Sequence, residues 1–82
     1  MPDVGKDTEI KTNAYWGSLE WANSQLRFGI SILQGSAGIL QSLKGRIQLA
    51  LILRDQLREY RFSWQAKILE HWIHRAQGGE FP

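Results

Sequence analysis

Hydrophobic residues recur every seven positions through the first half of this chain. One row consists of Leu19, Leu26, Leu33, Leu40 and Ile47, and a smaller row follows three positions behind it: Ala22, Gly29, Ser36, Leu43 and Ala50. Residues three and four positions apart share one face of an α-helix. The pattern predicts a helix-packing seam in which small residues permit a close approach, made by Leu19, Leu26, Gly29, Leu33, Leu40 and Ile47.

Local signals predict where the helical part begins and ends. Ser18, or alternatively Asn13, suits the first cap, and Ser18 is preferred because Glu20 then lies in the first turn. A stop at Gln77 is expected, since Gly78 and Gly79 follow a basic last turn. Residues 1–13 are expected to form a flexible N-terminal tail, and 78–82 a C-terminal tail.

The second half of the chain carries apolar residues on two sides of a helix predicted over 47–77. At 100° per residue, one arc contains Tyr60, Trp64, Ile68 and Trp72, and the other contains Phe62, Ala66, Leu69 and Ile73. A single neighbouring helix can cover only one arc. We therefore expect the outward-facing residues to contact a partner, with the interface formed by Tyr60, Phe62, Trp64, Ile68, Trp72 and Ile73.

These patterns predict an all-α fold. The first expectation is a two-helix hairpin over 14–77 with its turn near 44–46, or alternatively at 35–38; the second is one long bent helix. Each internal glycine costs a helix about 1 kcal/mol relative to alanine, so oligomer or partner helices are expected to complete the fold. The hairpin would place Trp16 and Trp21 beside Trp64 and Trp72 at its open end.

Length and charge limit the classes of function. A chain of 82 residues buries only about 60% of its unfolded surface, and it has no cysteine for a disulfide or thiolate site. The net charge is +2. Arg54, Arg58 and Arg61 form the best nucleic-acid surface, but Asp55 and Glu59 dilute it. Nucleic-acid binding is therefore the second alternative function.

No catalytic or cofactor site is expected. His71 and His74, with Glu70, resemble metal ligands on one helix face, but no third ligand is spaced to join them. The stretch 35–38 lacks the ending of a phosphate-binding loop, and no serine lies in a nucleophile motif. We expect neither an enzyme nor a bound metal or cofactor.

Membrane association is the first alternative function. The stretch 28–43 is uncharged, yet it is too short and too polar to span a bilayer. A hairpin at the membrane surface remains compatible with the sequence. No signal peptide is visible in the polar first residues, so the cytoplasm or a membrane periphery is expected, with the compartment itself unknown.

The leading prediction is a non-catalytic helical interaction protein. It would pack against copies of itself or against a larger helical partner as a structural subunit, because its apolar helical surface exceeds what a hairpin can bury.

Overall fold

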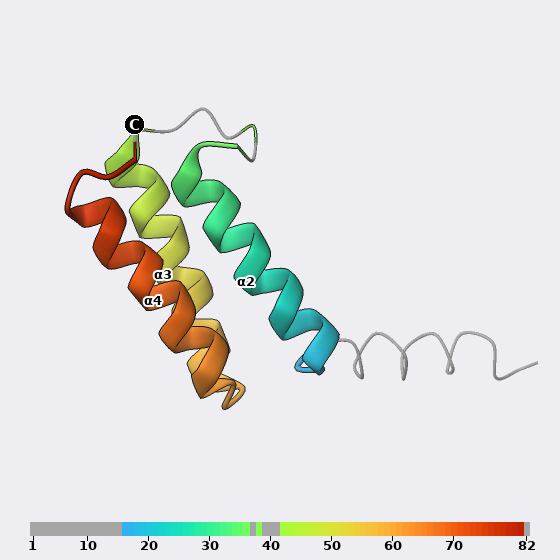
Figure 1. Ribbon diagram of the computed structural model, residues 1–82. Coiled ribbons are helices and arrows are strands. Elements are labelled where there is room, and N and C mark those ends of the chain that lie inside the picture. Colours follow the sequence, from blue (N-terminus) through green and yellow to red (C-terminus); the bar gives the residue numbers. More distant parts are fainter. Residues whose placement is uncertain (1–15, 37, 39–41, 82) are drawn as a thin grey trace, which may run out of the picture.

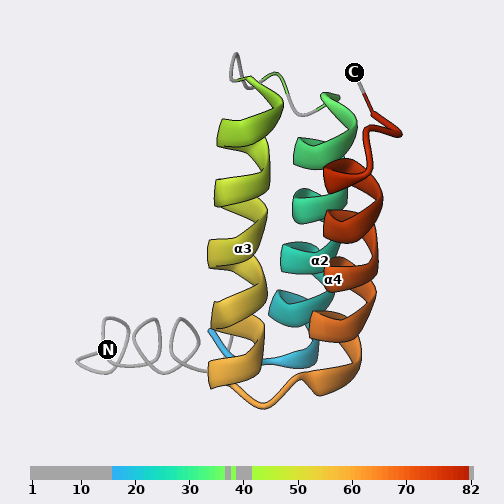
Figure 2. The same cartoon turned by 90° about the vertical axis from the view of Figure 1, so that its left-hand side faces the viewer.

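The computed structural model describes residues 16–36, 38 and 42–81. Three helices pack together in these residues: α2 (Leu19–Gln34), α3 (Leu43–Glu59) and α4 (Ser63–Gln77). α3 runs opposite to α2 and α4 (Figure 1), and Figure 2 shows the three axes nearly side by side. The all-α prediction is confirmed. The two-helix hairpin and the single bent helix are wrong, because the predicted helix over 47–77 is two helices.

Serine side chains start the first two helices. The Ser18 hydroxyl accepts a hydrogen bond from the backbone N–H of Trp21 at 3.1 Å, which confirms Ser18 as the cap. The Ser42 hydroxyl does the same for Gly45 at 3.3 Å. Residues 44–46 lie in the first turn of α3, directly after this cap. The turn predicted there is therefore wrong. The chain instead leaves the helix after Gln34, where the alternative break at 35–38 begins.

All three helices end in the same backbone motif, with one residue at positive φ just after the helix. In α2 and α4 this residue is a glycine, Gly35 (φ 79°) and Gly79 (φ 83°). The next backbone N–H then reaches back to the last turn, from Ser36 to Ser31 O at 2.9 Å and from Glu80 to Arg75 O at 3.2 Å. The predicted stop at Gln77 is confirmed.

The end of α3 uses the same motif without a glycine. Arg61 adopts φ 67°, and the backbone N–H of Phe62 donates to Leu57 O at 2.8 Å. This geometry costs a residue with a side chain about 1–2 kcal/mol. The next residue, Phe62, packs against the core. The chain thereby reverses direction between Glu59 and Ser63, at a point that has neither glycine nor proline.

The core is contributed by all three helices. It combines large side chains with alanines, and its buried apolar members are Trp21, Ala22, Ile32, Leu33, Ala50, Leu57, Ala66, Leu69, Ile73 and Ala76. The close approach predicted for the small row is found at Gly29, which is buried. A Cβ there would lie only 2.7 Å from Leu69 Cδ1. Gly29 thus allows α2 and α4 to approach each other.

Polar side chains join the helices at the margin of this core. Gln25 Nε2 of α2 donates to Gln56 Oε1 of α3 at 2.8 Å, and the buried Gln65 of α4 donates to Asn23 Oδ1 at 3.2 Å. Arg46 is also buried, and its Nη1 donates to Leu33 O at 3.2 Å in the last turn of α2. A cation at this position complements the negative end of the helix dipole.

Candidate interaction surface

Aromatic rings gather where α2 begins and where α3 turns into α4. These segments lie at the same end of the bundle, at the bottom of Figure 1. The Trp21 ring is buried at the centre: its centroid lies 4.9 Å from that of Tyr60 in an edge-to-face arrangement, 6.0 Å from Trp16 and 6.2 Å from Phe62. Edge-to-face and tilted ring pairs at these distances are mutually attractive. The rings therefore hold one another in place.

Gly17 makes this packing possible. Its φ is 85°, and a Cβ there would lie 2.9 Å from Tyr60 Cδ1. Only a glycine combines this backbone conformation with such close contact. The Gly17 backbone therefore turns the chain into α2 while it lies against the Tyr60 ring.

Four large side chains at this end are substantially exposed. Trp16 is 53% exposed, Leu19 61%, Tyr60 49% and Trp64 67%. We call these four residues the aromatic end. Single exposed apolar side chains are normal in soluble proteins, and Phe28 and Ile52 are of that kind in the middle of α2 and α3. The aromatic end differs because all four residues lie near the start of α2 or the connection from α3 to α4, and two of them, Trp16 and Tyr60, pack on the buried Trp21.

The two apolar arcs predicted for the second half of the chain differ in how deeply their residues are buried. Ala66, Leu69 and Ile73 are buried, with Phe62 half-buried against them. Tyr60 and Trp64 are exposed, whereas Ile68 and Trp72 are half-buried. Of the six predicted interface residues, Ile73 is therefore a core residue and Phe62 mostly supports the core. The predicted clustering of Trp72 with Trp16 and Trp21 is wrong, because the Trp72 ring instead stacks on Phe81.

The predicted packing seam is divided between core and surface. Leu33 and Gly29 are buried, and Leu26 and Ile47 are half-buried against the core. Leu19 points outward at the aromatic end, since α2 has only just begun there. Leu40 lies outside the described residues, as do Asn13 and the predicted tail over 1–13. The sequence pattern identified neither Trp16 nor Leu19 as a surface residue of this end.

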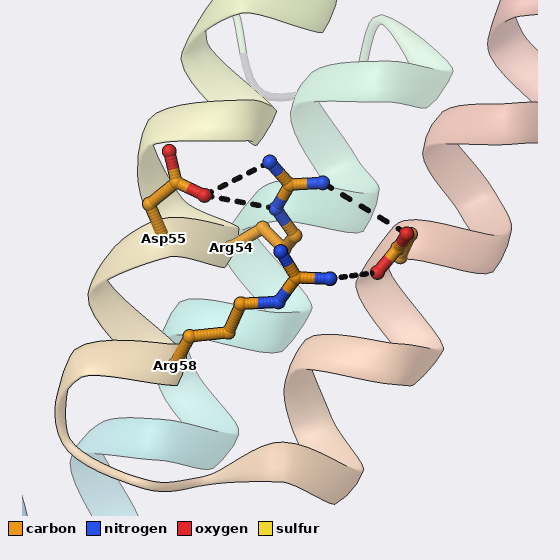
Figure 3. A network of polar contacts seen from close by, with 4 residues as sticks. Arg54, Asp55 and Arg58 are labelled. Carbon is orange, nitrogen blue, oxygen red and sulfur yellow. Dashed lines mark hydrogen bonds and ion pairs between the residues drawn. The ribbon is translucent and has the colours of Figure 1, made fainter.

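Two of the three arginines predicted as a nucleic-acid surface, Arg54 and Arg58, form ion pairs with acidic residues (Figure 3). Arg54 Nη2 lies 2.9 Å from Asp55 Oδ1, and Arg58 Nη2 lies 2.6 Å from Glu70 Oε2 on α4. A second, longer contact of 3.9 Å joins Arg54 Nη1 to Glu70 Oε1. Arg61 lies in the turn after α3 and so leaves the helix face that the spacing predicted. Glu70, which faces both guanidinium groups, reduces the positive potential that phosphate would require.

The remaining features are the two histidines of α4 and one open hollow. His71 and His74 are exposed on α4, and the described residues contain no group of three or more His, Cys, Asp or Glu side chains placed to hold a metal. An open hollow of about 330 Å³ lies between the start of α3 and the end of α4. The described residues that line it carry no carboxylate, imidazole or hydroxyl group: Leu43, Lys44, Ile47, Gln48, Ala76, Gln77 and Gly79.

Two further findings bear on the kind of protein this is. None of the helices in the described part of the chain has the length and apolarity needed to cross a membrane. No protein-family model, curated protein sequence or solved structure matches the chain.

Proposed function

We propose that this protein is a non-catalytic helical assembly module. It would dock its aromatic end on the helices of another chain, either a copy of itself or a larger helical partner. The observation that carries this proposal is the exposure of Trp16, Leu19, Tyr60 and Trp64 around one end of a bundle that already has its own core. Clustered exposed apolar side chains of this size usually mark an interaction site.

The packing below the surface favours binding. Trp16 and Tyr60 lie against the buried Trp21 ring, so they lose little conformational freedom when a partner covers them. Tryptophan and tyrosine are enriched among the residues that dominate interface energies. The aromatic end therefore combines large contact area with a pre-ordered arrangement.

Membrane-surface association remains the alternative proposal. Exposed tryptophan and tyrosine also suit the boundary between lipid and water. The exposed cations Arg61 and Lys67 lie near the same end of the bundle. Two acidic residues, Glu20 and Glu59, are exposed in the same region and oppose attraction to anionic lipid. Protein is thus the favoured partner. Nucleic-acid binding is disfavoured by the ion pairs of Arg54 and Arg58.

Sedimentation velocity of the full chain over a range of concentrations tests the proposal. We expect association that Trp64→Ser and Leu19→Ser each weaken roughly tenfold, since burial of one large apolar side chain contributes about 1.5–3 kcal/mol. Ile52→Ser is the matched control, because Ile52 is 55% exposed in the middle of α3. Circular dichroism should show all three variants folded.

Three results would contradict parts of this proposal. A wild-type chain that stays monomeric at every concentration excludes self-assembly. Equal association of Trp64→Ser and the wild type excludes the aromatic end as the contact. Co-sedimentation with anionic vesicles that Trp64→Ser abolishes, in a chain that does not self-associate, would support the membrane alternative instead.

A further inference from the structure

Glu80 and Phe81 fold back onto α4. The Phe81 ring stacks on Trp72 with a centroid separation of 5.8 Å and an interplanar angle of 14°. The Arg75 guanidinium lies 4.7 Å from the Trp72 centroid and 5.5 Å from that of Phe81. Arg75 Nε also donates to Glu80 Oε2 at 3.2 Å. Two neighbouring residues, one acidic and one aromatic, thus occupy a site formed by Trp72 and Arg75.

The two glycines that connect this pair to the helix are exposed and have no side chains to pack. A Cβ on Gly79 would meet no atom within 4 Å, and one on Gly78 would meet only carbonyl oxygens of the last turn. Gly79 also has φ 83°, a conformation open to glycine. Backbone hydrogen bonds from Gly78, Gly79 and Glu80 to the last turn of α4 hold the start of the segment, and the side chains of Glu80 and Phe81 hold its tip.

The contacts at the tip are of a kind that another ligand can replace. The ion pair is solvent-exposed, with Arg75 at 37% and Glu80 at 51% side-chain exposure, and such pairs contribute little net stability. Trp72 and Phe81 are each half-buried at the margin of the core. Ring stacking and cation–π contacts do not require one particular sequence. An acidic and an aromatic residue on another chain can therefore form the same contacts.

We infer that Trp72 and Arg75 form a docking site for a partner segment in which an acidic residue precedes an aromatic residue, and that Glu80 and Phe81 are its intramolecular competitor. The carboxylate pairs with Arg75 while the ring covers Trp72. A tethered ligand acts at a high effective concentration, so the free chain holds the site covered. This site lies away from the aromatic end and does not depend on it.

Peptide titration of the full-length protein tests the inference. The probe is a free peptide with the sequence of residues 78–82, acetylated at its N-terminus, and the readout is the indole N–H resonance of Trp72. We expect Phe81→Ala, which opens the site, to bind the peptide at least fivefold more tightly than the wild type. Adding Arg75→Gln to Phe81→Ala should remove most of that gain, as should a peptide with glutamine in place of glutamate.

The outcomes distinguish a binding site from a simple helix stop. If residues 78–81 only terminate α4, Phe81→Ala lowers the melting temperature and the peptide shifts no Trp72 resonance in either protein. That result, or equal binding by the wild type and Phe81→Ala, overturns the inference. Neither result affects the aromatic end, which Trp64→Ser tests separately in sedimentation.

Discussion

Gly29 of α2 lies directly against Leu69 of α4, so closely that a methyl group on Gly29 would come within 2.7 Å of Leu69 Cδ1. Leu69 is fully buried and cannot move aside into solvent. This contact explains why a glycine occupies the middle of α2, where alanine would favour the helix by about 1 kcal/mol. The glycine lowers the helix propensity of α2 but lets α2 and α4 lie close together.

Gly29→Ala should therefore destabilise the protein. Overpacking costs about 1–3 kcal/mol, which exceeds the gain in helix propensity, so we expect the free energy of unfolding to fall by about 1 kcal/mol in urea denaturation. In a Leu69→Val background the same change should be neutral or stabilising, because the shortened side chain leaves room. Stabilisation of the wild type by Gly29→Ala would contradict the close contact.

Leu33 and Leu19 belong to the same row, which repeats every seven residues, but substitution by aspartate should unfold the protein only at Leu33. Leu33 is completely buried and Leu19 is 61% exposed. Leu33→Asp buries an unpaired charge and should abolish the helical circular dichroism signal. Leu19→Asp should leave that signal intact. Equal loss of structure in both variants would favour one continuous seam over the three-helix bundle.

Arg61→Gly should stabilise the turn between α3 and α4. Arg61 has φ 67°, and removing its side chain relieves a conformational cost of about 1 kcal/mol. We expect a higher denaturation midpoint with an unchanged slope. Arg61→Ala is the control, since alanine keeps a Cβ and should not stabilise. Similar gains from glycine and alanine would attribute the effect to charge removal rather than to the backbone.

The ion pair between Arg58 and Glu70 should contribute little to stability. Arg58 is 52% exposed and Glu70 28% exposed, so solvent screens their attraction. A double-mutant cycle with Arg58→Ala and Glu70→Ala should give a coupling of at most about 1 kcal/mol, and salt should reduce it further. A coupling that salt leaves unchanged would indicate a more buried pair than the structure shows.

Much of this protein follows from short-range chemistry that the sequence displays. Ser18 caps α2 because its hydroxyl can reach the N–H of Trp21. α4 stops at Gln77 because Gly78 and Gly79 follow it and Gly79 accepts a positive φ. Helical periodicity also placed Ala66, Leu69 and Ile73 on one face, and the structure buries all three, although Ile73 was predicted for the partner interface as well.

Tertiary packing decided what these local signals could not. The break at Arg61 carries no glycine or proline, so no local signal marks it; in the structure Arg61 has a positive φ and the next residue, Phe62, packs against the core. Residues 44–46 look like a turn, yet they are helical, and the buried Arg46 bonds to Leu33 O of α2. Capping acts over one helical turn and is visible in sequence, whereas burial depends on residues far apart in the chain.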